Sequence, residues 1–289
     1  MRPWQPDMEK LVCVLPTQRH KEEERVSQRT FTYTARLLKG SALLPQMRIL
    51  VRLWHEGATP AEIVARIERH HLLGAASHRR IRDIVTVIFL PRYVHGNPPH
   101  AWRFLRPFEE VDAPLSVVRP LYYLYAARSE AFMGDFVRLV LYERYFEGLA
   151  TVRVGDVLHF IGEAEADGRI SEPWSENVRV NVARNLLAAL RDFGILEGRT
   201  RKRIAAPYLP ILPFAHIAFL LAQERGGAAV FDHPDWRLFL LQPETVERLF
   251  IEADRDGLLH YNAAGSIVRI DFPEEDLYAY SRFLAKRAC

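Results

Sequence analysis

The sequence predicts a mainly α-helical protein, with bundle-like helical domains that contain helix-turn-helix or winged-helix-like units and two short β-hairpins. Three observations predict this class. Apolar residues recur at helical spacing through most of residues 31–286. Proline, glycine and helix-capping residues divide this stretch into segments of helix length. Two of the helices are followed directly by a hairpin-like segment, a pattern that winged helices share with many small α+β modules.

The length and composition are those of a globular protein. The chain has 289 residues, of which 49% are hydrophobic and 26% are charged. It is too apolar for a disordered protein and long enough for one large or two small domains. Residues 1–30 are expected to form a flexible arm, because 18–29 are polar and charged without an apolar stripe. The remainder divides into an N-terminal helical domain, 31–113, and a C-terminal helical domain, 114–289.

Three helices are expected in the N-terminal domain, over 43–55, 59–71 and 77–89. The second has Thr59 in the N-cap position and Pro60 in the first helical position, where both residue types are preferred. The third should end before Pro91, because proline cannot continue the hydrogen bonding of an α-helix. Residues 91–113 contain four prolines and are interpreted as a proline-rich loop that closes the domain.

Seven helices are expected in the C-terminal domain, over 114–128, 130–146, 154–166, 175–193, 211–223, 243–254 and 274–286. Apolar residues cover most of the circumference of 130–146, which indicates a central, buried helix. Ser175 is a candidate N-cap for the helix that begins there, and Gly194 marks its end.

Two wing-like hairpins are expected, near 195–205 and 258–272. The first consists of an apolar pair, a glycine, a basic run and an isoleucine. The second has strands at 258–261 and 266–272, and the latter strand roughly alternates apolar and polar residues, as a half-buried strand should.

The formal net charge of +3 conceals segments of opposite charge. Residues 179–203 contain seven bases and two acids, a balance of +5. Residues 232–276 contain eleven acids and four arginines, a balance of −7. A further basic segment, 66–82, has five arginines and one glutamate. The distribution of charge therefore bears on the partner of the protein more than the total does.

Arginine-rich segments of this kind predict contacts with nucleic acid. The guanidinium group holds a phosphate with two hydrogen bonds and also enters the minor groove. The candidate contacts are Arg199, Arg201, Lys202 and Arg203 on the first hairpin, Arg179 and Arg184 on the helix before it, and Arg79, Arg80 and Arg82 as a second site. Asn177, Asn181 and Asn185 recur every four residues and place three amides on one helix face, where amides read adenine edges. A solvated basic surface remains the alternative for both arginine groups.

The sequence contains no motif that supports catalysis. Walker, dinucleotide-binding and zinc-protease motifs are absent, as is any cysteine pair with metal-ligand spacing. No nucleophile–base pairing is evident. We therefore expect a protein that is not an enzyme, with no cofactor and no metal.

Two features indicate a cytoplasmic protein that has no membrane partner. The two cysteines, Cys13 and Cys289, form no disulfide framework and suit a reducing compartment. The first ten residues lack the apolar core of a signal peptide, and the longest mostly apolar run, 211–222, is too short to span a bilayer.

Several segments together resemble the BrxA family, a core component of BREX phage-defence systems. They are 33–44 (YTARLLKGSALL), 139–145 (LVLYERY), 185–194 (NLLAALRDFG), 235–241 (DWRLFLL), 257–261 (GLLHY) and 264–273 (AGSIVRIDFP). The resemblance covers roughly residues 31–285, and it lies in the set of segments, since none is a catalytic signature. It implies a small, mainly helical, non-enzymatic protein that binds double-stranded DNA beside other BREX proteins.

The expected function is therefore that of a double-stranded-DNA-binding accessory protein in a BREX-type defence system. The alternative is a protein-interaction adaptor within the defence complex, whose acidic C-terminal region docks on a basic partner without contacting DNA. The site residues given above come from charge and spacing alone, and the sequence does not indicate an oligomeric state.

Overall fold

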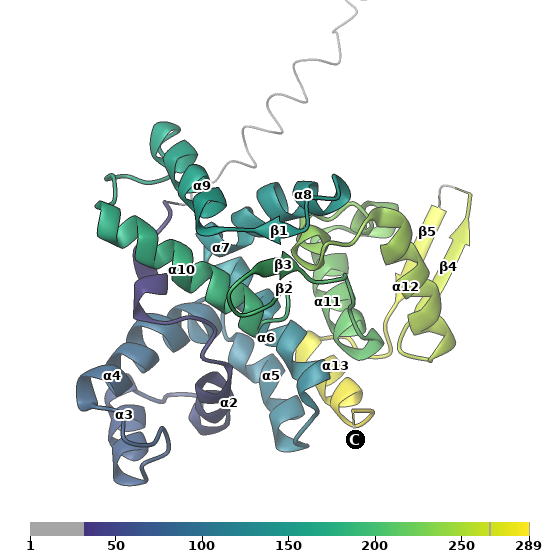
Figure 1. The fold of residues 1–289 in the computed structure, drawn as a ribbon. Helices are drawn as coiled ribbons and strands as arrows, with labels where there is room; N and C mark the ends of the chain where they lie inside the picture. Colours follow the sequence, from purple (N-terminus) through teal and green to yellow (C-terminus); the bar gives the residue numbers. More distant parts are fainter. Residues whose placement is uncertain (1–31, 266, 289) are drawn as a thin grey trace, which may run out of the picture.

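The described part of the chain is mainly helical, as the sequence predicts. The computed structural model describes residues 32–265 and 267–288. Helices make up the body of the molecule, and the strands form two small antiparallel sheets (Figure 1). The predicted mainly α-helical class with two short hairpins is confirmed. The arm expected at 1–30 lies outside the described residues.

The N-terminal region contains the three helices that the sequence predicts, which begin close to their expected positions, together with further helical segments. They are η1 (Ala35–Lys39), α2 (Leu44–Leu53), α3 (Pro60–Arg69), α4 (His78–Asp83), η2 (Ile84–Val94) and α5 (Ala101–Glu110). The cap predicted for the second expected helix is present, because the Thr59 hydroxyl accepts a hydrogen bond from the Glu62 N–H at 3.2 Å. Ser77 caps α4 in the same way, accepting from the Arg80 N–H at 3.3 Å.

The expectation that the third helix ends before Pro91 is wrong. The chain runs from α4 directly into η2, a π-helix that contains Pro91. Ile88, Phe89 and Tyr93 on η2 are all buried in the core. The burial of these side chains offsets the hydrogen bond that proline cannot donate.

The proline-rich loop expected at 91–113 contains helix α5. Trp102, Leu105 and Phe108 recur every three residues and are buried, and α5 packs against α2 and α13. The helix forms around Pro107 because tertiary packing outweighs the local cost of proline. The division of the chain at residue 113 stays a prediction.

The C-terminal helices also follow the expected order. They are α6 (Leu115–Ser129), α7 (Ala131–Asp135), η3 (Phe136–Leu141), α8 (Tyr142–Phe146), α9 (Val154–Ala166), α10 (Glu176–Asp192), α11 (Ile211–Glu224), α12 (Pro243–Arg255) and α13 (Leu277–Ala285). The expectation of a buried helix over 130–146 is only partly right, because Leu139 and Phe146 near its end are 54% and 42% exposed. Helix α6 is the more central one, since residues 121–127 are all buried.

A first helix–hairpin unit spans residues 151–204. It consists of β1 (Thr151–Val152), α9, α10, β2 (Leu196–Glu197) and β3 (Lys202–Ile204). The three strands form an antiparallel sheet in the order β1-β3-β2, in which Arg203 lies opposite both Thr151 and Glu197. The hairpin is the one expected near 195–205. Strand β1 was not expected, because two residues carry no periodic signal.

A second helix–hairpin unit spans residues 227–271 and lies at the far side of the molecule from α9 and α10 (Figure 1). It consists of η4 (Gly227–Val230), η5 (Pro234–Phe239), α12, β4 (His260–Ala264) and β5 (Ile267–Asp271). The two strands pair antiparallel, and η4 packs against β5. The hairpin is the one expected near 258–272, although β4 extends into the segment expected as its turn.

A chain of polar contacts joins the two units. Arg169, between α9 and α10, donates to the Tyr33 hydroxyl at 2.8 Å, and Tyr33 donates to Asp135 at 2.8 Å. Arg138 then bridges Asp135, at 3.1 Å, and Asp235 of η5, at 2.6 Å. Because the Asp235 side chain is only 7% exposed, this chain fixes the second unit against the middle of the molecule.

Candidate nucleic-acid interface

The β2–β3 hairpin presents its arginines on a tight turn. Gly198 has φ +85°, and a Cβ atom there would lie 2.1 Å from the Arg201 carbonyl oxygen. Only glycine fits this backbone conformation without strain. The turn leaves the side chains of Arg199 and Arg201 exposed to solvent.

The four hairpin cations do not point the same way. Successive strand residues face opposite sides of a sheet, and Ile204 is buried while Arg203 is exposed. Lys202 therefore lies on the same side as Ile204 and is half-buried, and its Nζ donates to the Arg199 carbonyl at 3.1 Å. Burial, and then the nearby charge of Arg191, lower the pKa of Lys202 from its ordinary value. Lys202 thus closes the turn, and the other three cations are the ones available to a partner.

The two arginines predicted on α10 differ in their surroundings. Arg184 is exposed, whereas Arg179 is half-buried and pairs with Glu165 of α9 at 3.2 Å. Of the three asparagines predicted on one face of this helix, Asn185 is not free to contact DNA bases, because its side chain donates to the Leu37 carbonyl at 2.9 Å. Asn177 and Asn181 remain exposed. The outward face of α10 therefore carries Asn177, Asn181 and Arg184.

A hollow of about 610 Å³ lies where β1, the start of α9, α10 and the hairpin turn meet. It is lined by Thr151, Val152, Arg153, Val154, Arg184, Leu187, Thr200, Arg201 and Lys202. The hollow brings together three of the predicted site residues, Arg184, Arg201 and Lys202. It adds Arg153, which the sequence did not indicate because its position depends on the unexpected strand β1.

The second predicted patch is smaller than its sequence implies. Arg79 and Arg82 on α4 are exposed. Arg80, however, donates from Nη1 to the Lys39 carbonyl at the end of η1. Its guanidinium therefore satisfies an orphan carbonyl of a neighbouring helix. Two of the three arginines remain available to a ligand.

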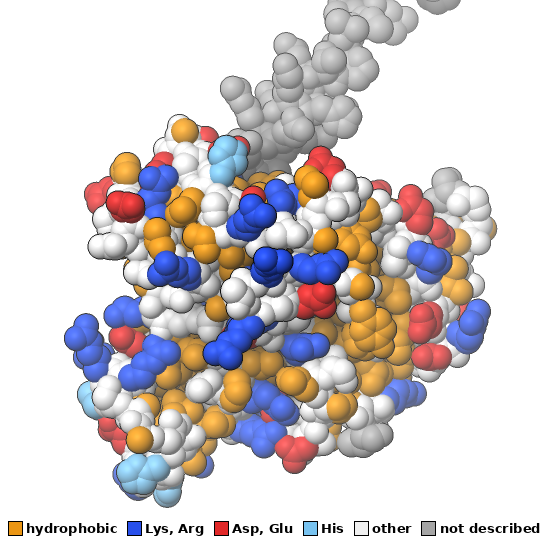
Figure 2. All heavy atoms as spheres, in the orientation of Figure 1, with side chains coloured by type: hydrophobic (Ala, Val, Ile, Leu, Met, Phe, Trp, Pro, Cys, Tyr) orange, Lys and Arg blue, Asp and Glu red, His pale blue; other side chains and the backbone are white. Residues whose placement is uncertain are grey.

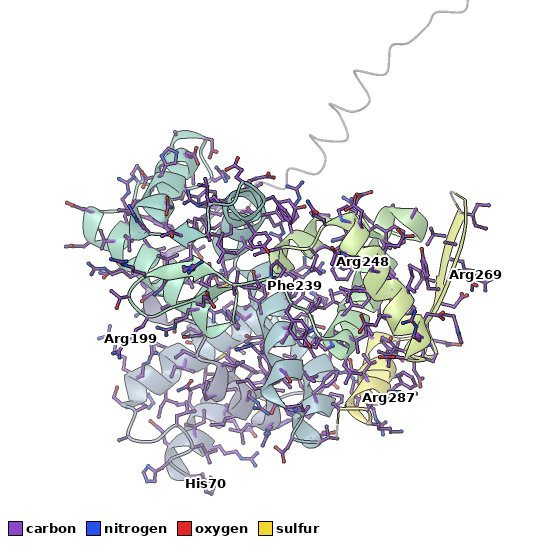
Figure 3. The ribbon with its side chains drawn as sticks, turned by 45° about the vertical axis from the view of Figure 1, so that its right-hand side comes forward. His70, Arg199, Phe239, Arg248, Arg269 and Arg287 are labelled. Atoms are coloured by element: carbon purple, nitrogen blue, oxygen red, sulfur yellow. The ribbon has the colours of Figure 1, made fainter. Side chains whose placement is uncertain are left out.

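The basic residues of the first unit gather on one face. Figure 2 shows Lys and Arg side chains over α10 and the β2–β3 hairpin, while acidic and basic side chains are mixed over α12 and the β4–β5 hairpin. In Figure 3, Arg199 and Arg269 point away from opposite sides of the molecule. Arg269 on β5 is paired with Asp271 at 2.7 Å. The two units thus present different surfaces.

Within residues 32–265 and 267–288, no helix combines the length and the apolar content needed to cross a bilayer. This finding concerns the described helices alone.

Comparison with known proteins places the chain in a family. The family model of BrxA matches residues 32–220, and no curated protein matches the chain. Among solved structures, the crystal structure of an uncharacterized protein from Magnetospirillum magneticum is similar, with 17% identity and a TM-score of 0.55. The match covers 72% of this chain and 98% of that one, and shows a common fold. Since the family model spans more than half of the sequence, the chain belongs to the BrxA family, and this membership supports the role in BREX phage defence that the resemblance implied.

Proposed function

We propose that the protein is a non-enzymatic component of a BREX defence system in the cytoplasm, and that it binds double-stranded DNA through the first helix–hairpin unit. The observation that carries the proposal is a group of exposed arginines at one end of that unit. Arg184, Arg199, Arg201 and Arg203 all reach solvent. Within the described residues, none of the four is paired with an acid.

The order of elements supports a winged-helix reading of the first unit. A short strand, two helices and a hairpin follow one another, and the short strand pairs with the second strand of the hairpin. In winged helices and other helix-turn-helix proteins, the second helix of the pair enters the major groove. Here that helix is α10, and the hairpin is the wing beside it.

The outward face of α10 has side chains suited to base edges. Asn177, Asn181 and Arg184 follow at intervals of four and three residues, which places them on one face. Asparagine pairs with adenine and arginine with guanine in the major groove. The hairpin arginines would contact phosphates and supply most of the affinity, which should then decrease linearly with salt on logarithmic axes.

Duplex binding measured by fluorescence anisotropy at several KCl concentrations tests the proposal. The triple variant Arg199→Ala/Arg201→Ala/Arg203→Ala should weaken binding and reduce the magnitude of the salt slope by about 0.9 for each phosphate that the protein no longer neutralises. The matched control removes three arginines of the second unit, Arg248→Ala/Arg255→Ala/Arg269→Ala. Equal effects of the two triple variants would show that the binding is not localised to the hairpin.

The second candidate function is that of an adaptor for other BREX proteins, favoured by the −7 balance of residues 232–276. Glu244, Glu252 and Asp256 are exposed on or beside α12 and are suited to a basic partner. Co-purification from cells that carry the whole defence system tests it. Replacing the three acids with Gln or Asn should release such a partner and leave duplex binding unchanged.

A further inference from the structure

The hollow of the first unit combines cations, hydroxyls and an apolar floor. Arg153 approaches from the end of β1, Arg184 from α10, and Arg201 from the hairpin turn. Thr151 and Thr200 add hydroxyl groups, and Leu187 lines the apolar part. Three elements distant in sequence therefore bring positive side chains to one concave place.

The cations of the hollow lack acidic partners, although acids lie nearby. Within the described residues, neither Arg153, Arg184 nor Arg201 forms an ion pair. The neighbouring carboxylates already have partners: Asp156 pairs with Arg144 at 3.4 Å, Glu165 with Arg179 at 3.2 Å and Asp192 with Arg191 at 2.6 Å. The hollow thus keeps an uncompensated positive charge, and the repulsion among its cations is relieved when an anion binds.

The start of α9 adds to this field. Val154, the first residue of this 13-residue helix, lines the hollow. A helix N-terminus carries partial positive charge and free N–H groups. Asp156 accepts a hydrogen bond from the Arg153 N–H at 2.6 Å, and its charge is offset by Arg144. The remaining field favours a compact anion with several acceptor oxygens.

We propose that this hollow binds a phosphate group, with Arg153, Arg184 and Arg201 as its ligands, and that the phosphate belongs to the DNA backbone. The inference rests on the proposed function. It adds Arg153, which lies outside α10 and the β2–β3 hairpin, to the residues that contact DNA. Arg153, which follows β1, would share one phosphate with Arg184 of α10 and Arg201 of the hairpin turn. A phosphate held between the helix and the hairpin fixes the register of α10 in the groove, which is the general role of phosphate contacts.

Arg153→Ala, with Arg282→Ala as its control, tests the hollow directly. Both arginines are exposed, and Arg282 lies on α13, outside the first unit. With a duplex of about 20 base pairs, Arg153→Ala should reduce affinity about tenfold and lower the magnitude of the salt slope by about 0.9. Arg282→Ala should change neither, and Arg153→Lys should keep the slope. Circular dichroism melting confirms that the variants are folded.

The outcomes separate this inference from the function on which it rests. If Arg153→Ala behaves like Arg282→Ala while the triple hairpin variant loses binding, the hollow holds no phosphate and the proposed function stands. If the unmodified protein binds no duplex at any salt concentration, the proposed function itself fails.

A competition experiment distinguishes the source of the phosphate. Pyrophosphate is titrated against the protein–duplex complex, with KCl at matched ionic strength as the reference. Displacement no greater than with KCl, together with a reduced slope for Arg153→Ala, supports the DNA backbone as the ligand. Stronger displacement that is lost in Arg153→Ala supports the phosphate site but assigns it to a small free anion. Stronger displacement that Arg153→Ala leaves unchanged contradicts the site.

Discussion

The two helix–hairpin units share an order of elements and differ in their surfaces. Each has helical segments followed by an antiparallel hairpin, and each hairpin has a further segment beside its second strand: β1 beside β3, and η4 beside β5. In the first unit Arg199 and Arg201 are exposed and lack acidic partners among the described residues. In the second, Arg269 is paired with Asp271.

The backbone arrangement of a unit therefore does not determine which partner the unit binds. A similar order of elements presents a group of exposed arginines on α10 and the hairpin of one unit, and a mixed, net acidic surface on the other. Function is therefore argued from the side chains of each unit, since one fold hosts many functions.

The largest expected effect comes from breaking the contacts that join the units. Asp235 is buried and pairs with Arg138 at 2.6 Å and Arg128 at 3.2 Å. Asp235→Ala removes the buried carboxylate that two largely buried guanidinium groups share, leaving Asp135 to Arg138 and Glu224 to Arg128, and should lower the free energy of unfolding by about 3 kcal/mol. Urea denaturation measures this loss in the free energy of unfolding. The exposed pair provides the control, because Asp271→Ala should cost about 1 kcal/mol or less. Similar losses in the two variants would contradict a stabilising role for the buried contacts.

An acid-sensitive group in α11 provides the next test. His216 is fully buried, with Nε2 2.6 Å from the Tyr125 hydroxyl and Nδ1 3.2 Å from the Ser281 hydroxyl. Burial lowers the pKa of His216 to about 3, whereas in the unfolded chain its pKa is about 6.5. At a pH between these two pKa values, His216 is protonated in the unfolded chain and neutral in the folded protein.

Stability should therefore be lost as the pH falls below about 6.5, by up to about 1.4 kcal/mol per pH unit from this group. Urea denaturation at about pH 7, 6 and 5 spans this range and measures the loss. His216→Gln, which does not titrate, should show a correspondingly weaker dependence on pH over this range. An unchanged pH dependence in that variant would assign the acid sensitivity to other groups.

The smallest effect distinguishes the two hairpins. Gly198 and Gly265 both have positive φ, +85° and +61°, but only at Gly198 would a Cβ meet the backbone, at 2.1 Å. Gly198→Ala should add at least the strain of a left-handed residue, about 1–2 kcal/mol, and displace the arginines on the turn. We expect about tenfold weaker duplex binding. Gly265→Ala has similar strain without the clash and should leave duplex binding unchanged. Equal binding by the two variants would contradict a role for the first turn.

The sequence predicted local features well. The bounds of α9 and the Thr59 cap follow from nearby residues, and both are present as expected. Helix α5 was missed because its stability comes from packing on α2 and α13, which no local pattern around Pro107 reveals.

The candidate site was also predicted only in part, because contacts between distant segments decide which of its side chains are free. The positive charge of the hairpin is evident in the sequence. The sequence does not show which side chains on the neighbouring helix α10 are already engaged by contacts within the protein. Glu165 neutralises Arg179 and the Leu37 carbonyl engages Asn185 through contacts between distant segments. Arg153 joins the site only because β1 pairs with β3. Which charges remain free is thus a property of the tertiary structure.

The proposed function requires that the first unit binds duplex DNA and that the second does not. Hydrogen–deuterium exchange of the full chain, with and without a saturating duplex, tests this most directly. We predict slower exchange over 151–154, 176–188 and 196–204 when the duplex is bound, and no change over 243–271. Protection confined to 243–271, or equal in the two units, would contradict the account.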